Sequence, residues 1–278
     1  MPHFILQTNE SHTYDAIVIG SGISGGWAAK EFCEKGLKTL VLERGRMVRH
    51  VTDYPTMNHE HWDFEHRGRL SYEDTRKYHI QVRIGFINEA NKHFHVNDVE
   101  NPYTEIKRFD WIRGDQVGGR SLLWGKQCYR WSDLDFEANA KEGIGIDWPI
   151  RYKDIEDWYT YVEKYVGISG EKLGLPHLPD GHFLPPMELN CLENPVKARI
   201  EGEFKKRYLT IGRVAHLTEP MSGRGKCQYR NRCSRGCPFG AYFSSNAVTL
   251  PAADATGNLT LRPDSGVHSV IYDAQTGI

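Results

Sequence analysis

Residues 14–43 read YDAIVIGSGISGGWAAKEFCEKGLKTLVLE, and this stretch decides the fold. It begins with a short apolar run, Ala16 to Ile19, which is typical of a strand buried on both faces. A turn with three glycines (residues 20–25, the glycine turn) follows at once, then a helical stretch, then a second apolar strand that ends at Glu43. A glycine turn that closes a strand and opens a helix, with an acid after the next strand, predicts a dinucleotide site in an α/β fold.

The residues of this stretch have separate predicted roles. Gly20 permits the tight turn, Gly22 lets a pyrophosphate approach the backbone, and Gly25 lets the helix pack close to the strand. The helix N-terminus offers free N–H groups and a positive dipole end to the phosphates. Glu43 is expected to accept hydrogen bonds from the adenosine ribose. The alternative is a glycine-rich turn in another kind of α/β protein.

Length and composition are those of a globular protein and exclude several classes. The 278 residues can form one large domain or two smaller ones. A formal net charge of −1 gives no sign of a nucleic-acid partner or a membrane surface. Residues 1–15 lack the charged start and apolar core of a signal peptide, and no apolar run approaches the roughly 18 residues of a membrane span. We expect a cytoplasmic chain, or one that is exported, for example to the periplasm, bound to a partner.

A second glycine-rich stretch is RGDQVGGRSLLWG, residues 113–125, called here the second glycine loop. Paired glycines followed by a serine and an aromatic residue let backbone and hydroxyl press against a flat, charged cofactor. On composition alone, a glycine loop beside a core tryptophan remains the alternative. The sequence contains no second three-glycine unit, which argues against a separate nicotinamide site.

These stretches resemble the glucose–methanol–choline (GMC) family of flavoprotein oxidoreductases. A third matching segment is IDWPIRYKDIEDWYTYVEKYVGISG, residues 146–170. The resemblance is to the branch of bacterial sugar and gluconate dehydrogenases whose catalytic subunit works with a small chaperone-like subunit and a cytochrome. It runs from about residue 14 to the end of the chain. It implies a Rossmann-like FAD-binding domain, in an enzyme where FAD accepts hydride from an alcohol carbon of a sugar or another alcohol.

The resemblance also implies cofactor contacts. Gly118, Gly119 and Ser121 would line the flavin pyrophosphate and ring, and Val267, in an expected late strand, would touch the adenine through its backbone. The predicted cofactor-binding residues are therefore Gly20, Gly22, Gly25, Glu43, Gly118, Gly119, Ser121 and Val267. One departure is informative: Leu123 stands where several sugar-oxidising relatives have a histidine bonded covalently to the flavin. Leucine cannot form that bond, so the sequence predicts a dissociable FAD.

Half of the six cysteines lie in KCQYRNRCSRGCPFGAY, residues 226–242. Cys227, Cys233 and Cys237 are close in sequence, and a proline follows the last of them. A disulfide would leave an odd thiol and needs an oxidising compartment. Zinc needs a fourth ligand, for which His216 is the nearest extra candidate. Buried thiols in a compact loop and an iron–sulfur cluster are the two other interpretations.

The spacing of the three thiols is compatible with an iron–sulfur cluster, and the family resemblance favours this interpretation. Tight spacing lets one loop wrap a cluster, and three ligands suit a three-iron, four-sulfur (3Fe-4S) centre. Basic neighbours would offset its negative charge and raise its reduction potential: Arg224, Lys226, Arg230, Arg232 and Arg235. GMC dehydrogenases with a cytochrome partner have similar spacing for such a cluster. The resemblance thus implies that electrons leave the flavin through Cys227, Cys233 and Cys237.

The predicted organisation is an α/β dinucleotide-binding sheet assembled from separated segments, at about residues 12–48, 110–140 and 241–278 of one FAD-binding portion, residues 1–278. An insertion at about residues 146–240 carries the cysteines. The remaining expectations concern local structure: a polar, His-rich stretch at 46–110, a linker at 171–190, an amphipathic helix at 194–209, a helix early in 241–258, and strands at 259–263 and 267–273. Metal binding by HEH (59–61) or HFH (93–95) is less favoured than exposure to solvent or contact with the cofactor.

The function expected from these features is that of an FAD-dependent sugar or alcohol dehydrogenase with an external electron acceptor. The alternatives are an oxidase of the same family, and a flavin- and metal-binding module that relays electrons without doing chemistry. Proton abstraction from the substrate hydroxyl needs a base, usually histidine, which GMC enzymes carry in their C-terminal half. None of the 13 histidines lies in a sequence that resembles the catalytic one. We therefore expect an N-terminal portion of a longer protein, or one piece of a split enzyme, without its C-terminal substrate domain.

Overall fold

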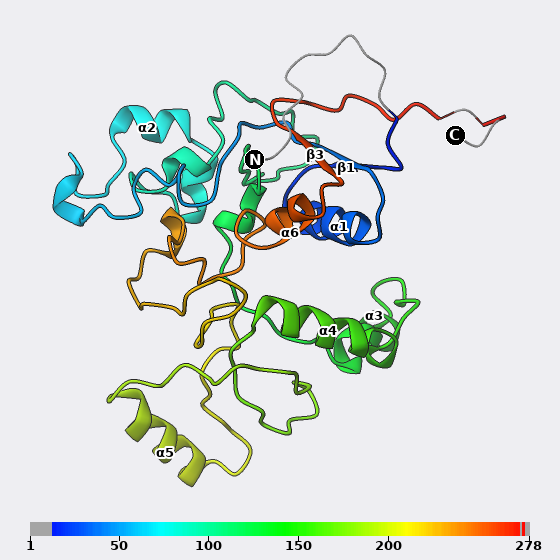
Figure 1. The fold of residues 1–278 in the computed structure, drawn as a ribbon. Coiled ribbons are helices and arrows are strands. Elements are labelled where there is room, and N and C mark those ends of the chain that lie inside the picture. The colour runs from blue at the N-terminus through cyan, green and yellow to red at the C-terminus, as the bar shows by residue number, and fades with distance from the viewer. Residues whose placement is uncertain (1–12, 273, 276–278) are drawn as a thin grey trace. The chain divides into compact units, whose positions relative to one another are not determined.

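The computed structural model describes residues 13–272 and 274–275, which form two compact units. Unit 1 comprises the described residues up to Trp124, residues 231–238, and those from Ser244 onward. Unit 2 comprises residues 125–230 and 239–243. The glycine turn and almost all of the second glycine loop belong to unit 1, so this unit holds the candidate cofactor site (Figure 1).

Unit 1 is built on a parallel sheet of three short strands, in the order β1-β2-β3. The strands are β1 (Ala16–Ile19), β2 (Thr39–Leu42) and β3 (Leu259–Arg262). Helix α1 (Ile23–Glu34) connects β1 to β2, which makes a β-α-β unit with the glycine turn between its first two elements. The predicted α/β fold with a parallel, Rossmann-like sheet is confirmed.

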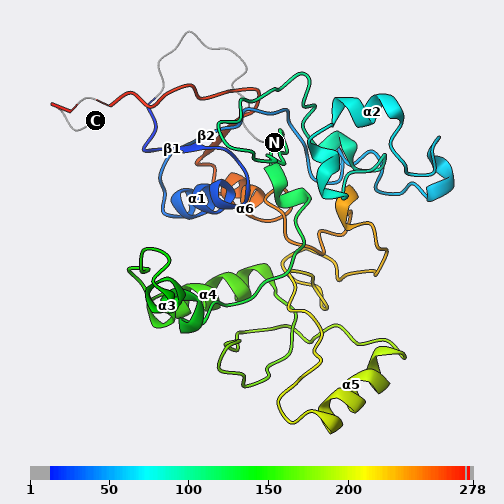
Figure 2. The same ribbon diagram turned by 180° about the vertical axis from the view of Figure 1, so that it is seen from behind.

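Two helices cover one face of this sheet. Helix α6 (Thr249–Ala255) lies beside α1 in both views (Figures 1 and 2). A methyl group at Gly26 of α1 would come within 2.5 Å of the Thr249 hydroxyl oxygen, so glycine permits this close approach. The core between sheet and helices contains Val18, Ala29, Cys33, Val41, Val117, Leu250, Ala253, Leu259 and Leu261.

The opposite face of β1 is open among the described residues. Ile17 is 60% exposed and Ile19 is 57% exposed, whereas Val18 between them is buried. The prediction that this strand is buried on both faces is therefore wrong. The physical reason is that α1 and α6 both pack on the Val18 side, and strand side chains alternate between faces.

The segment before β3 also differs from its prediction. The helix expected early in 241–258 begins only at Thr249. Ser245 and Asn246, which precede it, bond to residues distant in sequence: Ser245 N donates to the Ser121 hydroxyl, and Asn246 Nδ2 donates to the Val48 carbonyl at 2.7 Å. Such contacts compete with helical hydrogen bonding and delay the start of the helix.

The strand expected at 267–273 does not form in its described part. Residues 267–272 have no regular structure, and Asp273 lies outside the described residues. Val270 and Ile271 are 76% and 91% exposed, so these apolar side chains have no neighbouring strand to pack against. The strand predicted at 259–263, by contrast, is present as β3.

The His-rich stretch between β2 and the second glycine loop contains little regular structure, as expected from its lack of periodicity. Its one α-helix is α2 (Tyr72–Lys77), capped by the Ser71 hydroxyl, which accepts from Asp74 N at 3.0 Å. Its other helical elements are short 3-10 turns at His61–Asp63, Gln81–Ile84 and Lys92–Phe94, and most of the rest is irregular.

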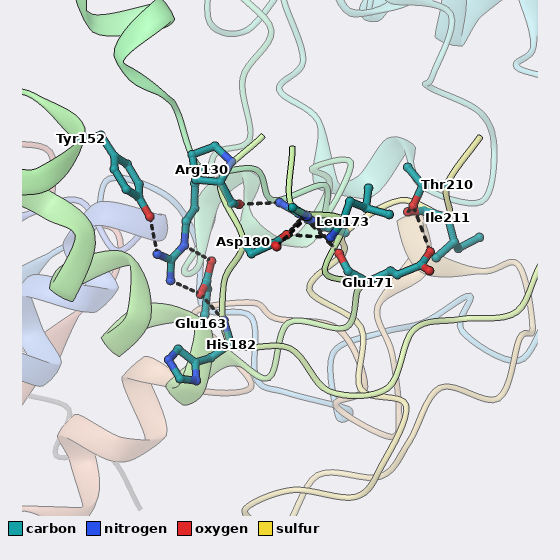
Figure 3. Close-up of polar contacts among 12 residues, drawn as sticks. Arg130, Tyr152, Glu163, Glu171, Leu173, Asp180, His182, Thr210 and Ile211 are labelled. Carbon is teal, nitrogen blue, oxygen red and sulfur yellow. Dashed lines mark hydrogen bonds and ion pairs between the residues drawn. The ribbon is translucent and has the colours of Figure 1, made fainter. Parts of the chain in front are cut away.

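Unit 2 contains helices α3 (Asp133–Glu142), α4 (Tyr152–Val166) and α5 (Glu193–Glu203). A buried ion pair joins Arg130 to Glu163 of α4, with Nη2 of the arginine 2.6 Å from Oε2 of the glutamate. The same glutamate oxygen accepts from His182 N (Figure 3). Removing one partner of a buried pair leaves an uncompensated charge, so loss of either side chain is expected to destabilise this unit.

The predicted linker and amphipathic helix both lie in unit 2. Residues 171–190 form neither helix nor strand, and Arg213 anchors them through an ion pair with Asp180 at 2.7 Å. The helix expected at 194–209 ends at Glu203, and none of its residues is buried. The amphipathic prediction is therefore wrong, because α5 buries no apolar face. Within the described residues, no helix is both long enough and apolar enough to cross a membrane.

Candidate dinucleotide site and cysteine stretch

The glycine turn has a backbone that requires glycine at two positions. Gly20 has φ +87°, a left-handed conformation that residues with a side chain rarely adopt. A Cβ at Gly25 would lie 1.9 Å from the Gly20 carbonyl oxygen, far inside van der Waals contact. Gly22 is the N-cap of α1, and a Cβ there would meet nothing within 4 Å, so space remains in front of the helix N-terminus.

Glu43 makes its contacts to the glycine turn itself. Its Oε2 accepts from Ser21 N at 2.9 Å and from the Ser21 hydroxyl at 2.6 Å, and its Oε1 accepts from Gly45 N at 2.9 Å. Glu43 is buried, and a carboxylate offers about four acceptor positions, so one remains for a ribose hydroxyl. The carboxylate thus stabilises the turn, and its contact with a ribose stays a prediction.

The second glycine loop lies directly against the glycine turn. Gly118 N donates to the Ser21 hydroxyl at 3.0 Å, and a Cβ at Gly119 would lie 3.3 Å from Gly22 Cα. Gly118 has φ +87°, and a side chain there would overlap Asn246 Oδ1 at 1.6 Å. The predicted glycines of both stretches are therefore neighbours in space, with Ser21 as the hydrogen-bonded link between them.

Ser121 is fully engaged within the protein. Its hydroxyl donates to the Gly118 carbonyl at 2.6 Å and accepts from Ser245 N at 3.0 Å. The Ser245 hydroxyl in turn donates to the Gly22 carbonyl at 3.0 Å. Ser121 has no exposed surface, so its observed role is to fix the 3-10 turn η4 (Gly119–Leu122) beside the glycine turn.

A cavity of about 420 Å³ opens where the two loops meet. Sequence reasoning missed Arg120 and Trp124 as members of its lining, although both lie within the quoted loop. The exposed Arg120 guanidinium adds a positive charge to the N–H groups at the start of α1, and together these suit a pyrophosphate. The lining residues are Ile19, Gly20, Gly22, Ile23, Ser24, Gly25, Arg120, Ser121 and Trp124.

Val267 lies just after a contact with the end of β2. Ser265 N donates to the Glu43 carbonyl at 2.8 Å, so the chain runs close to Glu43, the residue predicted to bind the ribose, two residues before Val267. Val267 itself is 37% exposed and in no regular element. Its predicted backbone contact with adenine therefore has no strand to support it, and it stays a prediction.

Of the two histidines of the HFH sequence, His95 is buried and His93 is half-buried, and both lie close in sequence to Phe94, which contacts the second glycine loop. Burial, with the charge of Arg120 for His95 and that of Arg46 for His93, lowers the pKa of each imidazole to about 4. Both are thus neutral near pH 7. His95 is only 9% exposed and does not face solvent, while the other expectation, contact with the cofactor, stays a prediction. Gln116 Nε2 ties this stretch to the loop by donating to the Phe94 and Gly119 carbonyls at 3.2 Å each.

The cysteine stretch is divided between the units. Cys227 belongs to unit 2, where its backbone N–H donates to the Leu217 carbonyl at 2.7 Å. Cys233 and Cys237 belong to unit 1, where Cys233 begins the 3-10 turn η5 (Cys233–Arg235). None of the six cysteines, all of which are described, forms a disulfide.

Four of the five basic residues expected to offset a cluster's charge have other partners, and one of these, Arg230, lies 5.6 Å over the Phe239 ring. The Arg224 guanidinium is buried and donates to the Val166 carbonyl at 2.7 Å, Arg235 donates to the His59 carbonyl at 2.7 Å, and Arg232 pairs with Glu60. Across the described residues, no three His, Cys, Asp or Glu side chains converge as a metal site requires. Because Cys227 lies in a different unit from Cys233 and Cys237, the predicted cluster rests on the sequence pattern.

No protein-family model matches the chain. Comparison with curated proteins, however, finds several similar ones. Fructose dehydrogenase large subunit of Gluconobacter japonicus is 22% identical over 98% of the chain. Paromamine 6'-oxidase of Streptomyces fradiae is 24% identical over 91% of it, and gluconate 2-dehydrogenase flavoprotein of Pantoea cypripedii is 26% identical over 93%. The chain spans 48%, 40% and 45% of the length of these three relatives, respectively.

These relatives are dehydrogenases and oxidases of GMC type, and their similarity runs along nearly all of the chain. The structure agrees with this similarity: the chain contains a parallel sheet, and its glycine turn and second glycine loop meet at one cavity. The predicted resemblance is confirmed: this chain is similar to GMC-type oxidoreductases, with 22%, 24% and 26% identity to the three named here.

Proposed function

We propose that this chain is the FAD-binding part of an enzyme that oxidises the CH–OH group of a sugar or another alcohol. The observation that carries the proposal is the cavity shared by the glycine turn and the second glycine loop. FAD bound there would accept hydride from the carbon that bears the hydroxyl. The N–H groups at the start of α1 and the Arg120 guanidinium would bind the pyrophosphate, and Ser21 would keep the two loops together.

The names of the relatives support a polyhydroxylated substrate. Fructose dehydrogenase and gluconate 2-dehydrogenase are named for a sugar and a sugar acid. The base that takes the hydroxyl proton is proposed to lie outside these 278 residues, because none of the 13 histidines stands in a sequence like the catalytic one. Turnover by this chain alone, abolished by changing one of its own histidines, would contradict that placement.

Electron exit is proposed to use Cys227, Cys233 and Cys237, which would bind a three-iron, four-sulfur cluster. Support comes from the spacing of three thiols and the following proline, and from thiolate being the ligand that such clusters require. The purified protein should contain about three irons per chain with acid-labile sulfide, and an oxidised-state paramagnetic signal. Protein that contains a full complement of FAD but no iron and no acid-labile sulfide would refute the proposed cluster. One zinc per chain would indicate a zinc site instead.

A partner that accepts the electrons is proposed to be a separate subunit. The relative from Gluconobacter japonicus is called a large subunit, which supports assembly with a smaller one, and a cytochrome is the proposed acceptor. Gel filtration of the native complex tests this assembly. Elution at the size of the lone polypeptide, without haem absorption, would contradict it.

Anaerobic reduction of the bound flavin distinguishes the proposed dehydrogenase from a relay module and from an oxidase. The complete purified protein is mixed anaerobically with a panel of sugars, sugar acids and simple alcohols, and the flavin absorption is followed. Bleaching by a sugar supports the proposal, and bleaching only by dithionite supports a relay module without chemistry of its own. Rapid reoxidation by oxygen would favour an oxidase, for which the paromamine 6'-oxidase relative is the specific observation.

A further inference from the structure

Ser245 is hydrogen-bonded to both glycine-rich stretches of unit 1. Its N–H donates to the Ser121 hydroxyl at 3.0 Å, and its own hydroxyl donates to the Gly22 carbonyl at 3.0 Å. Ser121 belongs to the second glycine loop and Gly22 to the glycine turn, and both line the cavity of about 420 Å³. Ser245 itself has no exposed surface and lies outside that lining, so it acts on the cavity only through the residues that it bonds.

The Gly22 carbonyl belongs to the peptide group that opens helix α1. It accepts from Gly26 N at 2.8 Å as well as from Ser245. A trans peptide is planar, so the Ile23 N–H points opposite to the Gly22 carbonyl. The first four N–H groups of a helix have no partner within the helix. The hydrogen bond from Ser245 therefore fixes the direction of one free N–H group, at a residue that lines the cavity.

The surroundings of Ser245 hold it in this place. A Cβ at Gly26 would lie 2.8 Å from the Ser245 hydroxyl oxygen, so glycine in α1 provides the room for the contact. The next residue, Asn246, donates through Nδ2 to the Val117 carbonyl at 2.9 Å. The segment that carries Ser245 is therefore attached to the second glycine loop at both Ser121 and Val117.

A separate link between the same two stretches passes through Ser21. Its hydroxyl accepts from Gly118 N at 3.0 Å and donates to Glu43 at 2.6 Å. The Ser21 link and the Ser245 link share no residue. Two segments joined at two points stay together when one link is lost, and separate when both are lost. Substitutions in the two links should therefore be strongly non-additive.

We propose that Ser245 is a positioning residue for the cofactor, which holds the Gly22 peptide group against the second glycine loop and so directs the Ile23 N–H at the pyrophosphate. The inference rests on the proposed FAD site. A donor fixed in advance lowers the conformational cost of binding. The link itself joins residues of this chain only, so it can be measured in protein without FAD.

The experiment compares the complete purified protein as wild type, Ser245→Ala, Ser21→Ala and the double variant. FAD is removed and then titrated back, with flavin fluorescence giving the Kd, and denaturant unfolding is followed on the same preparations. Amide hydrogen exchange of the FAD-free protein is read over residues 20–26 and 117–122. Ser245→Ala removes the bond to the Gly22 carbonyl and keeps the backbone N–H that bonds Ser121.

Thr39→Val is the matched control for loss of a buried hydroxyl. The Thr39 side chain has no exposed surface, like that of Ser245, but its hydroxyl donates to the Leu37 carbonyl at 3.0 Å, within its own segment. Thr39→Val should lower the free energy of unfolding and leave the Kd for FAD unchanged. A general loss of stability is thereby distinguished from a loss of positioning.

We expect Ser245→Ala and Ser21→Ala each to raise the Kd about threefold, and the double variant about a hundredfold, instead of the roughly tenfold that independent effects give. Exchange over residues 20–26 and 117–122 should be faster in Ser245→Ala than in wild type. Ser245→Cys keeps a side chain of similar size that donates only weakly, and its Kd and exchange rates should lie between those of wild type and Ser245→Ala.

Two results would overturn the inference: a double variant whose effect on the Kd equals the product of the single effects, or unchanged exchange over both ranges in Ser245→Ala. A Kd raised as much by Thr39→Val would also count against positioning. If Ser245→Ala does not fold, Ser245→Cys decides through the same measurements. Wild-type protein that binds no flavin would refute the proposed FAD site, whereas hydrogen exchange would still judge the Ser245 link.

Discussion

Replacing Gly22 with alanine is expected to weaken FAD binding without unfolding the chain. A Cβ at this position meets no atom within 4 Å, and its φ of −64° is one that alanine adopts readily. Alanine is a poorer N-cap than glycine, which destabilises α1 by up to about 1 kcal/mol. A less flexible unfolded chain offsets about 0.4–1 kcal/mol of that loss. The free energy of unfolding should therefore change by less than about 1 kcal/mol.

The new methyl group would occupy the space that a pyrophosphate needs. Gly22 lines the cavity at the start of α1, where the backbone N–H groups face the ligand. Moving the phosphates outward removes at least one hydrogen bond to a charged group, worth about 1.5–3 kcal/mol. The Kd for FAD should rise between about 10-fold and 100-fold, since about 1.4 kcal/mol corresponds to a factor of ten.

The assay pairs FAD titration, followed by quenching of flavin fluorescence, with denaturant unfolding of the same preparation. Gly25→Ala is the contrasting variant: its Cβ would lie 1.9 Å from the Gly20 carbonyl oxygen, so folding and binding should fail together. Gly202→Ala in α5 is the control, with nothing within 4 Å, and should bind FAD normally. The reasoning is refuted if Gly22→Ala binds FAD as wild type does, or loses FAD only by unfolding.

Three further predictions concern charge. Arg120→Gln should raise the Kd for FAD about tenfold and reduce its salt dependence, because one cation at the phosphates is lost; an unchanged salt dependence would count against its placement. Burial and the charge of Arg120 lower the pKa of His95 to about 4 from 6.5. Between these two pH values the unfolded chain binds a proton that the folded chain does not. The contribution of His95 to the free energy of unfolding therefore rises with pH across this window only. His95→Gln should therefore remove about 3 kcal/mol of acid destabilisation in pH-dependent denaturant titrations, and His177→Gln, at an exposed position, serves as the control substitution. Glu163→Gln should cost about 3–5 kcal/mol in unfolding experiments because it leaves a buried arginine uncompensated, whereas Glu156→Gln, in an exposed ion pair, should leave Tm unchanged.

The parts of the site that the sequence predicted depend on local backbone geometry. The glycine turn needs a left-handed residue at Gly20 and close approach at Gly25, and both requirements are set by neighbours a few residues away. The β-α-β order follows from the same thirty residues. Such a backbone geometry can be recognised in the sequence, because only glycine satisfies its steric requirements.

The parts that the sequence did not predict depend on tertiary contacts. The link made by the Ser21 hydroxyl joins residues 97 positions apart, and no periodicity marks it. Arg120 enters the cavity only because η4 lies against α1. Two predictions were wrong for the same reason: that both faces of β1 are buried, and that residues 267–272 form a strand. Burial depends on neighbouring elements, and a local apolar run does not reveal which elements these are.

The central claim is that this chain holds a dissociable FAD at the cavity between the glycine turn and the second glycine loop. The most direct measurement is acid precipitation of the purified protein, followed by identification and quantitation of the flavin in supernatant and pellet. The account predicts about one FAD per chain, all of it in the supernatant, because Leu123 cannot bond to the flavin as a histidine does. Flavin that stays with the denatured pellet, or protein that takes up a nicotinamide dinucleotide and no flavin, would contradict it.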